Sequence, residues 1–79
     1  MGVDDSPVGS FGRVTASGAI RPGRVGEVMV AIRGGVEAFL AVDADGGAID
    51  AYEEVVVVDY QPPRRVVVAR VKDRSGELE

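Results

Sequence analysis

The carboxylates between Asp43 and Glu54 are the side chains whose spacing comes nearest to a metal site. Counted from Asp43, acidic residues stand at positions 1, 3 and 12, where a calcium-binding loop carries ligands. Position 6 of such a loop needs a glycine for its sharp turn, and this chain has Ala48 there. Residues 43–47 also have the composition of an ordinary turn, in which aspartate side chains bond their own backbone. We therefore predict a turn at this place, with no metal ion.

Glycine-containing turns elsewhere have some of the composition of phosphate-binding loops. Gly23 and Gly26 mark one of them, and the pair Gly34-Gly35 marks the other. A phosphate-binding loop leads into a helix N-terminus and often carries a lysine, serine or threonine. Segments typical of strands follow both turns here, so we interpret them as simple turns.

The residue types that most enzymes use are missing or badly placed. The chain has no cysteine and no histidine, which excludes Ser-His and Cys-His pairs, zinc ligand sets of these residues and thiol redox chemistry. Its single lysine, Lys72, lies in a polar C-terminal segment. A net charge of −4 also opposes non-specific binding to nucleic acid. We predict that the protein is not an enzyme and binds no cofactor.

Valine dominates the apolar residues and predicts an all-β fold. The 79-residue chain has sixteen valines against two leucines and three isoleucines. Branched side chains favour pleated sheets, and eleven glycines with four prolines leave little room for a helix. The length allows one small domain.

Five segments between glycine and proline turns read as strands. They are residues 11–20, 25–32, 36–42, 55–60 and 65–71. Residues 1–10 are predicted to be a flexible arm, residues 11–71 the folded domain, and residues 72–79 a polar tail. The final Leu78-Glu79 is typical of a cloning remnant.

The hairpin at Gly34-Gly35 predicts a register in which Val30 lies opposite Phe39 and Met29 opposite Leu40. Both faces of this strand pair are partly apolar, which suggests a closed barrel. Residues 48–54 are predicted to be a short helical turn or an irregular crossover before the fourth strand. These features favour a small five-stranded antiparallel barrel, a Greek key of the OB-fold type.

Several segments resemble the C-terminal domain of NfeD-like proteins. They are residues 19–25 (AIRPGRV), residues 35–38 (GVEA), Ala48-Ile49 and the two closing strands. The resemblance covers about residues 20–71. The family has an I-x-x-G-x-x-V-x-V stretch, and where it carries its glycine this sequence reads Asp50-Ala51-Tyr52.

The resemblance implies a five-stranded OB-fold domain that acts as an interaction module and not as a catalyst. It further implies association with SPFH proteins, the stomatin and flotillin group, at membranes. The expected location is the cytoplasm, with membrane attachment through the partner or through a transmembrane segment outside this sequence. A homodimer is a secondary expectation.

The two valine-rich closing strands supply the predicted interaction surface. A strand that is apolar at consecutive positions is either buried on both sides or covered by a partner on its outer face. The candidate surface consists of Val55, Val57, Val66, Val68 and Tyr60.

An alternative ligand groove would bind single-stranded nucleic acid or an oligosaccharide, as other OB-type barrels do. Its candidate residues are Arg21, Arg24, Arg33 and Phe39. The arginine side chains could contact phosphates there, and the Phe39 ring could stack on a base. The net negative charge of the chain, however, weakens its long-range attraction for nucleic acid. These residues would need to converge in one groove.

Overall fold

The structure is a computed structural model that describes residues 6–71. The predicted polar tail with its Leu78-Glu79 remnant, Lys72 and the first half of the predicted arm lie outside the described residues.

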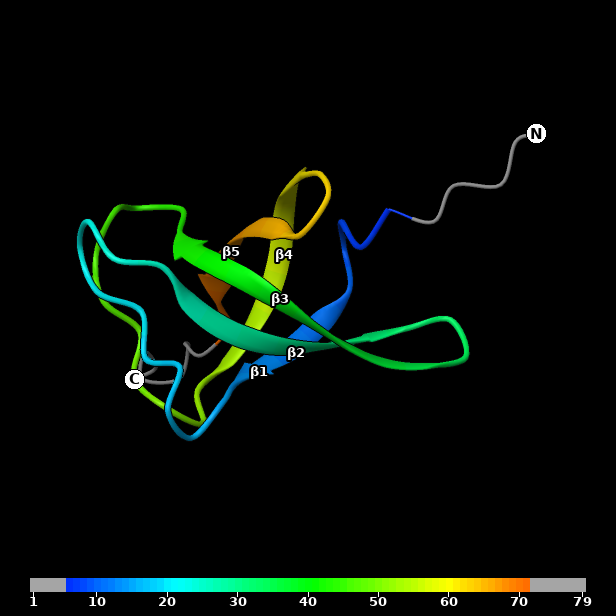
Figure 1. The fold of residues 1–79 in the computed structure, drawn as a ribbon, viewed down its shortest axis with the longest axis horizontal. Helices are drawn as coiled ribbons and strands as arrows, with labels where there is room; N and C mark the ends of the chain where they lie inside the picture. The colour runs from blue at the N-terminus through cyan, green and yellow to red at the C-terminus, as the bar shows by residue number, and fades with distance from the viewer. Residues whose placement is uncertain (1–5, 72–79) are drawn as a thin grey trace, which may run out of the picture.

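Five strands close into a barrel in the order β1-β2-β3-β5-β4 (Figure 1). They are β1 (Phe11–Val14), β2 (Gly26–Ile32), β3 (Gly35–Asp43), β4 (Glu54–Gln61) and β5 (Arg65–Arg70). The predicted all-β, OB-like barrel is confirmed. Its strands are not all antiparallel, however, because β3 and β5 run parallel. After the crossover β4 pairs with β1, so that β5 returns antiparallel to β4 and along the direction of β3.

The first strand is shorter than predicted because residues 15–25 fold over the start of β2. The Glu27 N–H donates to the Gly18 carbonyl at 2.9 Å. Gly26 allows this close approach, since a Cβ at that position would collide with the Gly18 carbonyl and lie 2.6 Å from Cγ1 of Ile20. Ile20 in turn forms an isolated bridge with Ile49, which joins this loop to the crossover.

The interior of the barrel is built from hydrocarbon side chains, and none of the buried residues within 6–71 is polar or charged. The core consists of Val14, Ile20, Val28, Val30, Phe39, Ala41, Ile49, Val55, Val57, Val66 and Val68. Alternation along each strand sends every second residue inward. The connection between β3 and β4 is an irregular crossover, which decides between the two predicted alternatives.

The prediction that the closing strands present their valines outward is wrong for four residues. Val55, Val57, Val66 and Val68 are at most 1% exposed and belong to the core. Their neighbours in the same strands point the other way, and among these Val58 is 46% exposed. The pairing of Val57 with Val68 in the β4–β5 ladder places these four valines on the same, inward side of the two strands.

The predicted register of the β2–β3 hairpin is wrong by two residues along β2. Ile32 pairs with Gly35, and Val28, not Val30, lies opposite Phe39. The turn is formed by Arg33-Gly34, with Gly34 at a φ of 85°, so it begins one residue earlier than predicted. Because the shift is even, each side chain stays on its predicted face of the strand pair.

Candidate interaction surface

The outer side of β1, β2 and β3 carries large apolar side chains that face away from the core. Phe11 is 55% exposed, Met29 37%, Val36 62% and Leu40 45%. Ala31 pairs with Val36 and is also exposed. We call these five residues (Phe11, Met29, Ala31, Val36 and Leu40) the apolar face. Four of them line a shallow hollow of about 230 Å³ together with Arg13 and Glu54.

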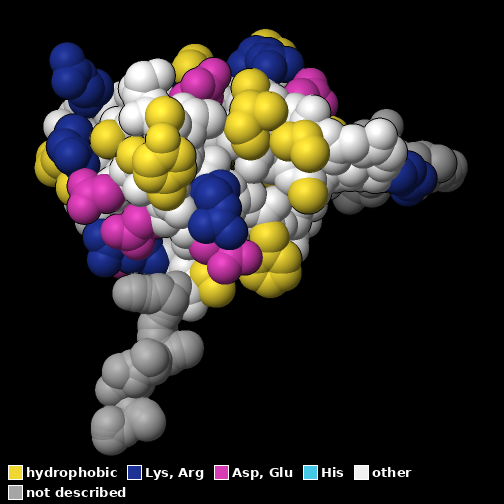
Figure 2. Space-filling model, turned by 90° about the horizontal axis from the view of Figure 1, so that it is seen from below, with side chains coloured by type: hydrophobic (Ala, Val, Ile, Leu, Met, Phe, Trp, Pro, Cys, Tyr) yellow, Lys and Arg dark blue, Asp and Glu magenta, His cyan; other side chains and the backbone are white. Residues whose placement is uncertain are grey.

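Charged side chains border the apolar face. Arg13 pairs with Met29 in the β1–β2 ladder and with Glu54 in the β1–β4 ladder, and its guanidinium donates to the Tyr52 carbonyl at 2.9 Å. Figure 2 views the molecule from below Figure 1, and it shows separate groups of hydrophobic side chains with basic and acidic side chains between them. Arg13 and Glu54 thus form part of a charged border to the apolar face, and a polar rim around an apolar centre is typical of protein interfaces.

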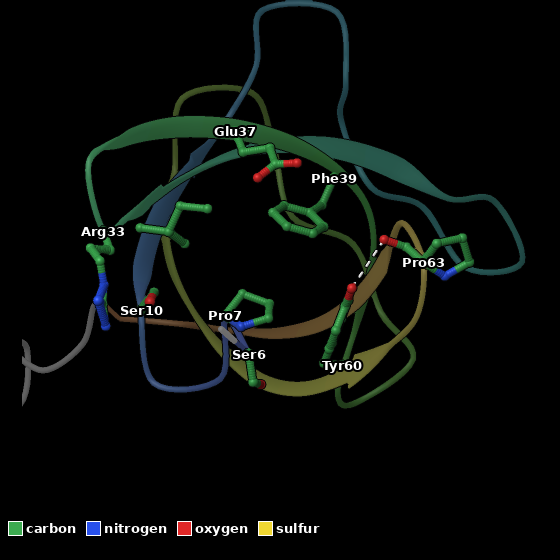
Figure 3. A pocket seen from close by; sticks show the side chains of 9 residues that line it. Ser6, Pro7, Ser10, Arg33, Glu37, Phe39, Tyr60 and Pro63 are labelled. Carbon is green, nitrogen blue, oxygen red and sulfur yellow. Dashed lines mark hydrogen bonds between the residues drawn. The ribbon is translucent and has the colours of Figure 1, made fainter. Parts of the chain in front are cut away.

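One end of the barrel forms a pocket of about 590 Å³ around Phe39 and Tyr60 (Figure 3). The two rings meet edge to face with centroids 6.1 Å apart, and the Tyr60 hydroxyl donates to the Pro63 carbonyl at 3.1 Å. Arg64 lies 5.4 Å from the centroid of the Phe39 ring. Tyr60 thus packs partly against the core at the barrel end and does not extend a valine surface.

The N-terminal segment closes the same end, so the folded part begins earlier than predicted. Pro7 is fully buried and points into the pocket beside the two rings (Figure 3). The Gly9 N–H donates to the Val57 carbonyl at 2.8 Å, and the Val57 N–H donates to the Ser10 carbonyl at 2.9 Å. The predicted arm is therefore anchored to β4 over part of its length.

The residues of the alternative ligand groove do not converge. Arg33 and Phe39 line the pocket at the barrel end. Arg21 and Arg24 line a different cleft, of about 290 Å³, between the β1–β2 turn, the β3–β4 loop and the start of β5. The structure therefore divides the predicted groove into two sites, and the single stacking platform that nucleic acid would need is not formed by these residues.

The acidic loop after β3 is a turn. The Gly47 N–H donates to Oδ2 of Asp43 at 3.0 Å, and the Gly46 N–H donates to the Asp43 carbonyl at 2.9 Å. Within the described range, no three carboxylates lie close enough to hold a metal ion. Gly23 also forms a turn, with a φ of 75° and a hydrogen bond from the Arg24 N–H to the Arg21 carbonyl at 2.9 Å.

A closed five-stranded barrel with this strand order is an OB-type fold, and residues 6–71 include no helix able to cross a membrane. The family model of the NfeD C-terminal domain matches residues 11–69, and the chain belongs to this family. It is also similar to the solution structure of the soluble domain of the NfeD protein YuaF from Bacillus subtilis. That similarity has a TM-score of 0.73 at 27% identity, and it covers 89% of this chain and 80% of that one. No curated protein matches the chain.

Proposed function

We propose that this domain is a non-enzymatic protein–protein interaction module and that a protein partner covers its apolar face. The exposure of Phe11, Met29, Val36 and Leu40 on adjoining strands carries the proposal. A group of large apolar side chains left in water on one side of a small domain is typical of a binding site. Aromatic and methionine side chains are also enriched where protein interfaces are buried.

The partner we propose is an SPFH-type membrane scaffold protein of the stomatin and flotillin group. Membership of the NfeD C-terminal family supports this class of partner. The domain would then act in the cytoplasm beside a membrane, held there by its partner or by a membrane-spanning segment of its parent protein. The nucleic-acid or oligosaccharide alternative is less well supported, because Arg21 and Arg24 lie in a different cleft from Arg33 and Phe39.

Substitution Val36→Glu tests the proposal directly. Val36 is 62% exposed, so the glutamate should leave folding intact while it places a charge within the apolar face. We expect binding to a purified SPFH protein from the same organism to weaken about tenfold or more, measured by calorimetry.

The matched control is Val58→Glu, which introduces the same charge at an exposed valine of β4. Circular dichroism should show both variants folded, and the control should bind like the parent chain. Equal binding by the Val36→Glu variant and the parent chain would refute the apolar face as the interface.

A further inference from the structure

The cleft at the end of β3 is lined by three arginines from two separate parts of the chain. Arg21 and Arg24 come from the β1–β2 turn, and Arg65 is the first residue of β5. We call these three residues the arginine cleft. The tight turn at Pro22-Gly23 brings the first two onto one side of a hollow of about 290 Å³, and the start of β5 supplies the third.

Two of these guanidinium groups have no partner within residues 6–71. Arg21 forms an ion pair with Asp50 at 3.1 Å, whereas the side chains of Arg24 and Arg65 are exposed and make no hydrogen bond or ion pair there. Asp43, whose Oδ2 accepts the Gly47 N–H, also lines the cleft, so three guanidinium groups face one carboxylate there. The cleft therefore offers free donors and positive charge in a chain whose net charge is −4.

The arginine cleft is continuous with the apolar face. Leu40 pairs with Arg65 in the β3–β5 ladder, and both side chains are exposed. Val25, which is 36% exposed, and Val42 line the cleft beside the arginines. A bound segment lying along β3 would thus pass from apolar contacts to cationic contacts without a gap.

We propose that the arginine cleft binds the carboxylates of an acidic segment in the protein partner, next to the apolar residues that cover the apolar face. This proposal rests on the proposed function. Guanidinium groups donate paired hydrogen bonds to carboxylates, and such charged bonds are stronger than neutral ones. An acidic segment is a better fit than an anionic membrane, because the Leu40–Arg65 pair joins the cleft to the apolar face and one protein segment can contact both.

A hexaglutamate peptide is the probe for this site. Titrated into the labelled protein at low ionic strength, it should shift the amide NMR signals of residues 21, 23–25, 46–47 and 65, and added salt should weaken the binding. The double variant Arg24→Gln/Arg65→Gln should bind about tenfold more weakly or worse, because two charge-assisted contacts are lost. Arg33→Gln is the matched control, since Arg33 is also exposed and without a partner in the described residues but lines the other pocket.

Three results would overturn the proposal. One is unchanged hexaglutamate binding in the double variant. Another is an equal set of shifts with inorganic phosphate at the same concentration, which would indicate a small-anion site. The third is arginine-dependent binding to vesicles of phosphatidylcholine and phosphatidylglycerol in the absence of any hexaglutamate binding, which would assign the cleft to a membrane.

The same variants distinguish this proposal from the proposed function. If Val36→Glu abolishes binding to the SPFH protein and the double arginine variant does not weaken it, the acidic segment is refuted and the apolar interface stands. If Val36→Glu has no effect, the proposed function itself fails, whatever the hexaglutamate titration shows.

Discussion

Tyr52 occupies a backbone conformation that suits glycine. Its φ is 71°, the one positive value among the non-glycine residues described. In the I-x-x-G-x-x-V-x-V pattern of the family, counted from Ile49, the glycine falls at this position. The Tyr52 side chain contributes little packing energy to the fold, since it is 64% exposed. Tyrosine at this positive φ therefore carries a conformational cost that glycine would not.

Replacing this tyrosine should stabilise the domain. We expect Tyr52→Gly to raise the free energy of unfolding by about 1 kcal/mol, because glycine adopts positive φ without the steric penalty. The Arg13 contact is to the backbone carbonyl and survives the change. Urea denaturation measures the gain, and Tyr52→Ala should give none, because alanine keeps the penalty. An equal gain from both variants would instead attribute the effect to loss of the ring.

Gly26 is required for a different reason: at the start of β2 the Gly18 carbonyl leaves no room for a Cβ atom. We expect Gly26→Ala to lower the free energy of unfolding by roughly 3 kcal/mol, since its Cβ would meet the backbone of the β1–β2 loop. Gly35→Ala is the control, because a Cβ there has nothing within 4 Å. Thermal unfolding of both variants should separate them clearly. Similar melting temperatures would mean that the loop moves away at little cost.

At the scale of elements, the β2–β3 hairpin extends beyond the rest of the barrel (Figure 1). β5 pairs with β3 only from Leu40 to Asp43, so the first part of β3 has an edge with no neighbouring strand. Arg64 covers this edge. Its guanidinium donates to the Ala38 carbonyl and forms an ion pair with Glu37 at 3.1 Å. An arginine placed across an open strand edge hinders pairing with a second chain.

Removing that side chain should promote self-association. We expect Arg64→Ala to form dimers and larger species at concentrations where the parent chain does not, because the β3 edge is then free to pair. Light scattering after size-exclusion chromatography measures the change, with Arg65→Ala as the neighbouring control. If both variants elute like the parent chain, Arg64 does not protect the edge.

The positions of the strands follow from the sequence more readily than the faces that their side chains occupy. The apolar residues on both faces of the β2–β3 pair predict a closed barrel, and the barrel is confirmed. One face is buried, while the other holds Met29, Val36 and Leu40 in solvent. Alternation defines two faces but cannot say which is inside when both are apolar. The same ambiguity affected residues 55–58, where the inward and outward positions are all valine.

At the scale of the whole molecule, closure of the barrel decides which distant residues meet. The barrel could be predicted from turn residues and strand spacing, because these are local signals, and the family from the resemblance of residues 19–25, 35–38 and 48–49. The arginine cleft could not, since Arg65 joins Arg21 and Arg24 only through the parallel pairing of β3 with β5. The separation of Arg33 from these residues has the same origin, because Arg33 lies in the hairpin turn that projects from the barrel.

Pro7, which precedes the first strand, fills part of the barrel end beside Phe39 and Tyr60. A fragment that begins at Phe11 would keep every strand, yet it would lack the proline that packs beside Phe39 and Tyr60. It would also lose the two backbone hydrogen bonds that Val57 forms with Gly9 and Ser10. A shortened chain should therefore begin upstream of Ser6, because the buried Pro7 belongs to the folded unit although it precedes the first strand.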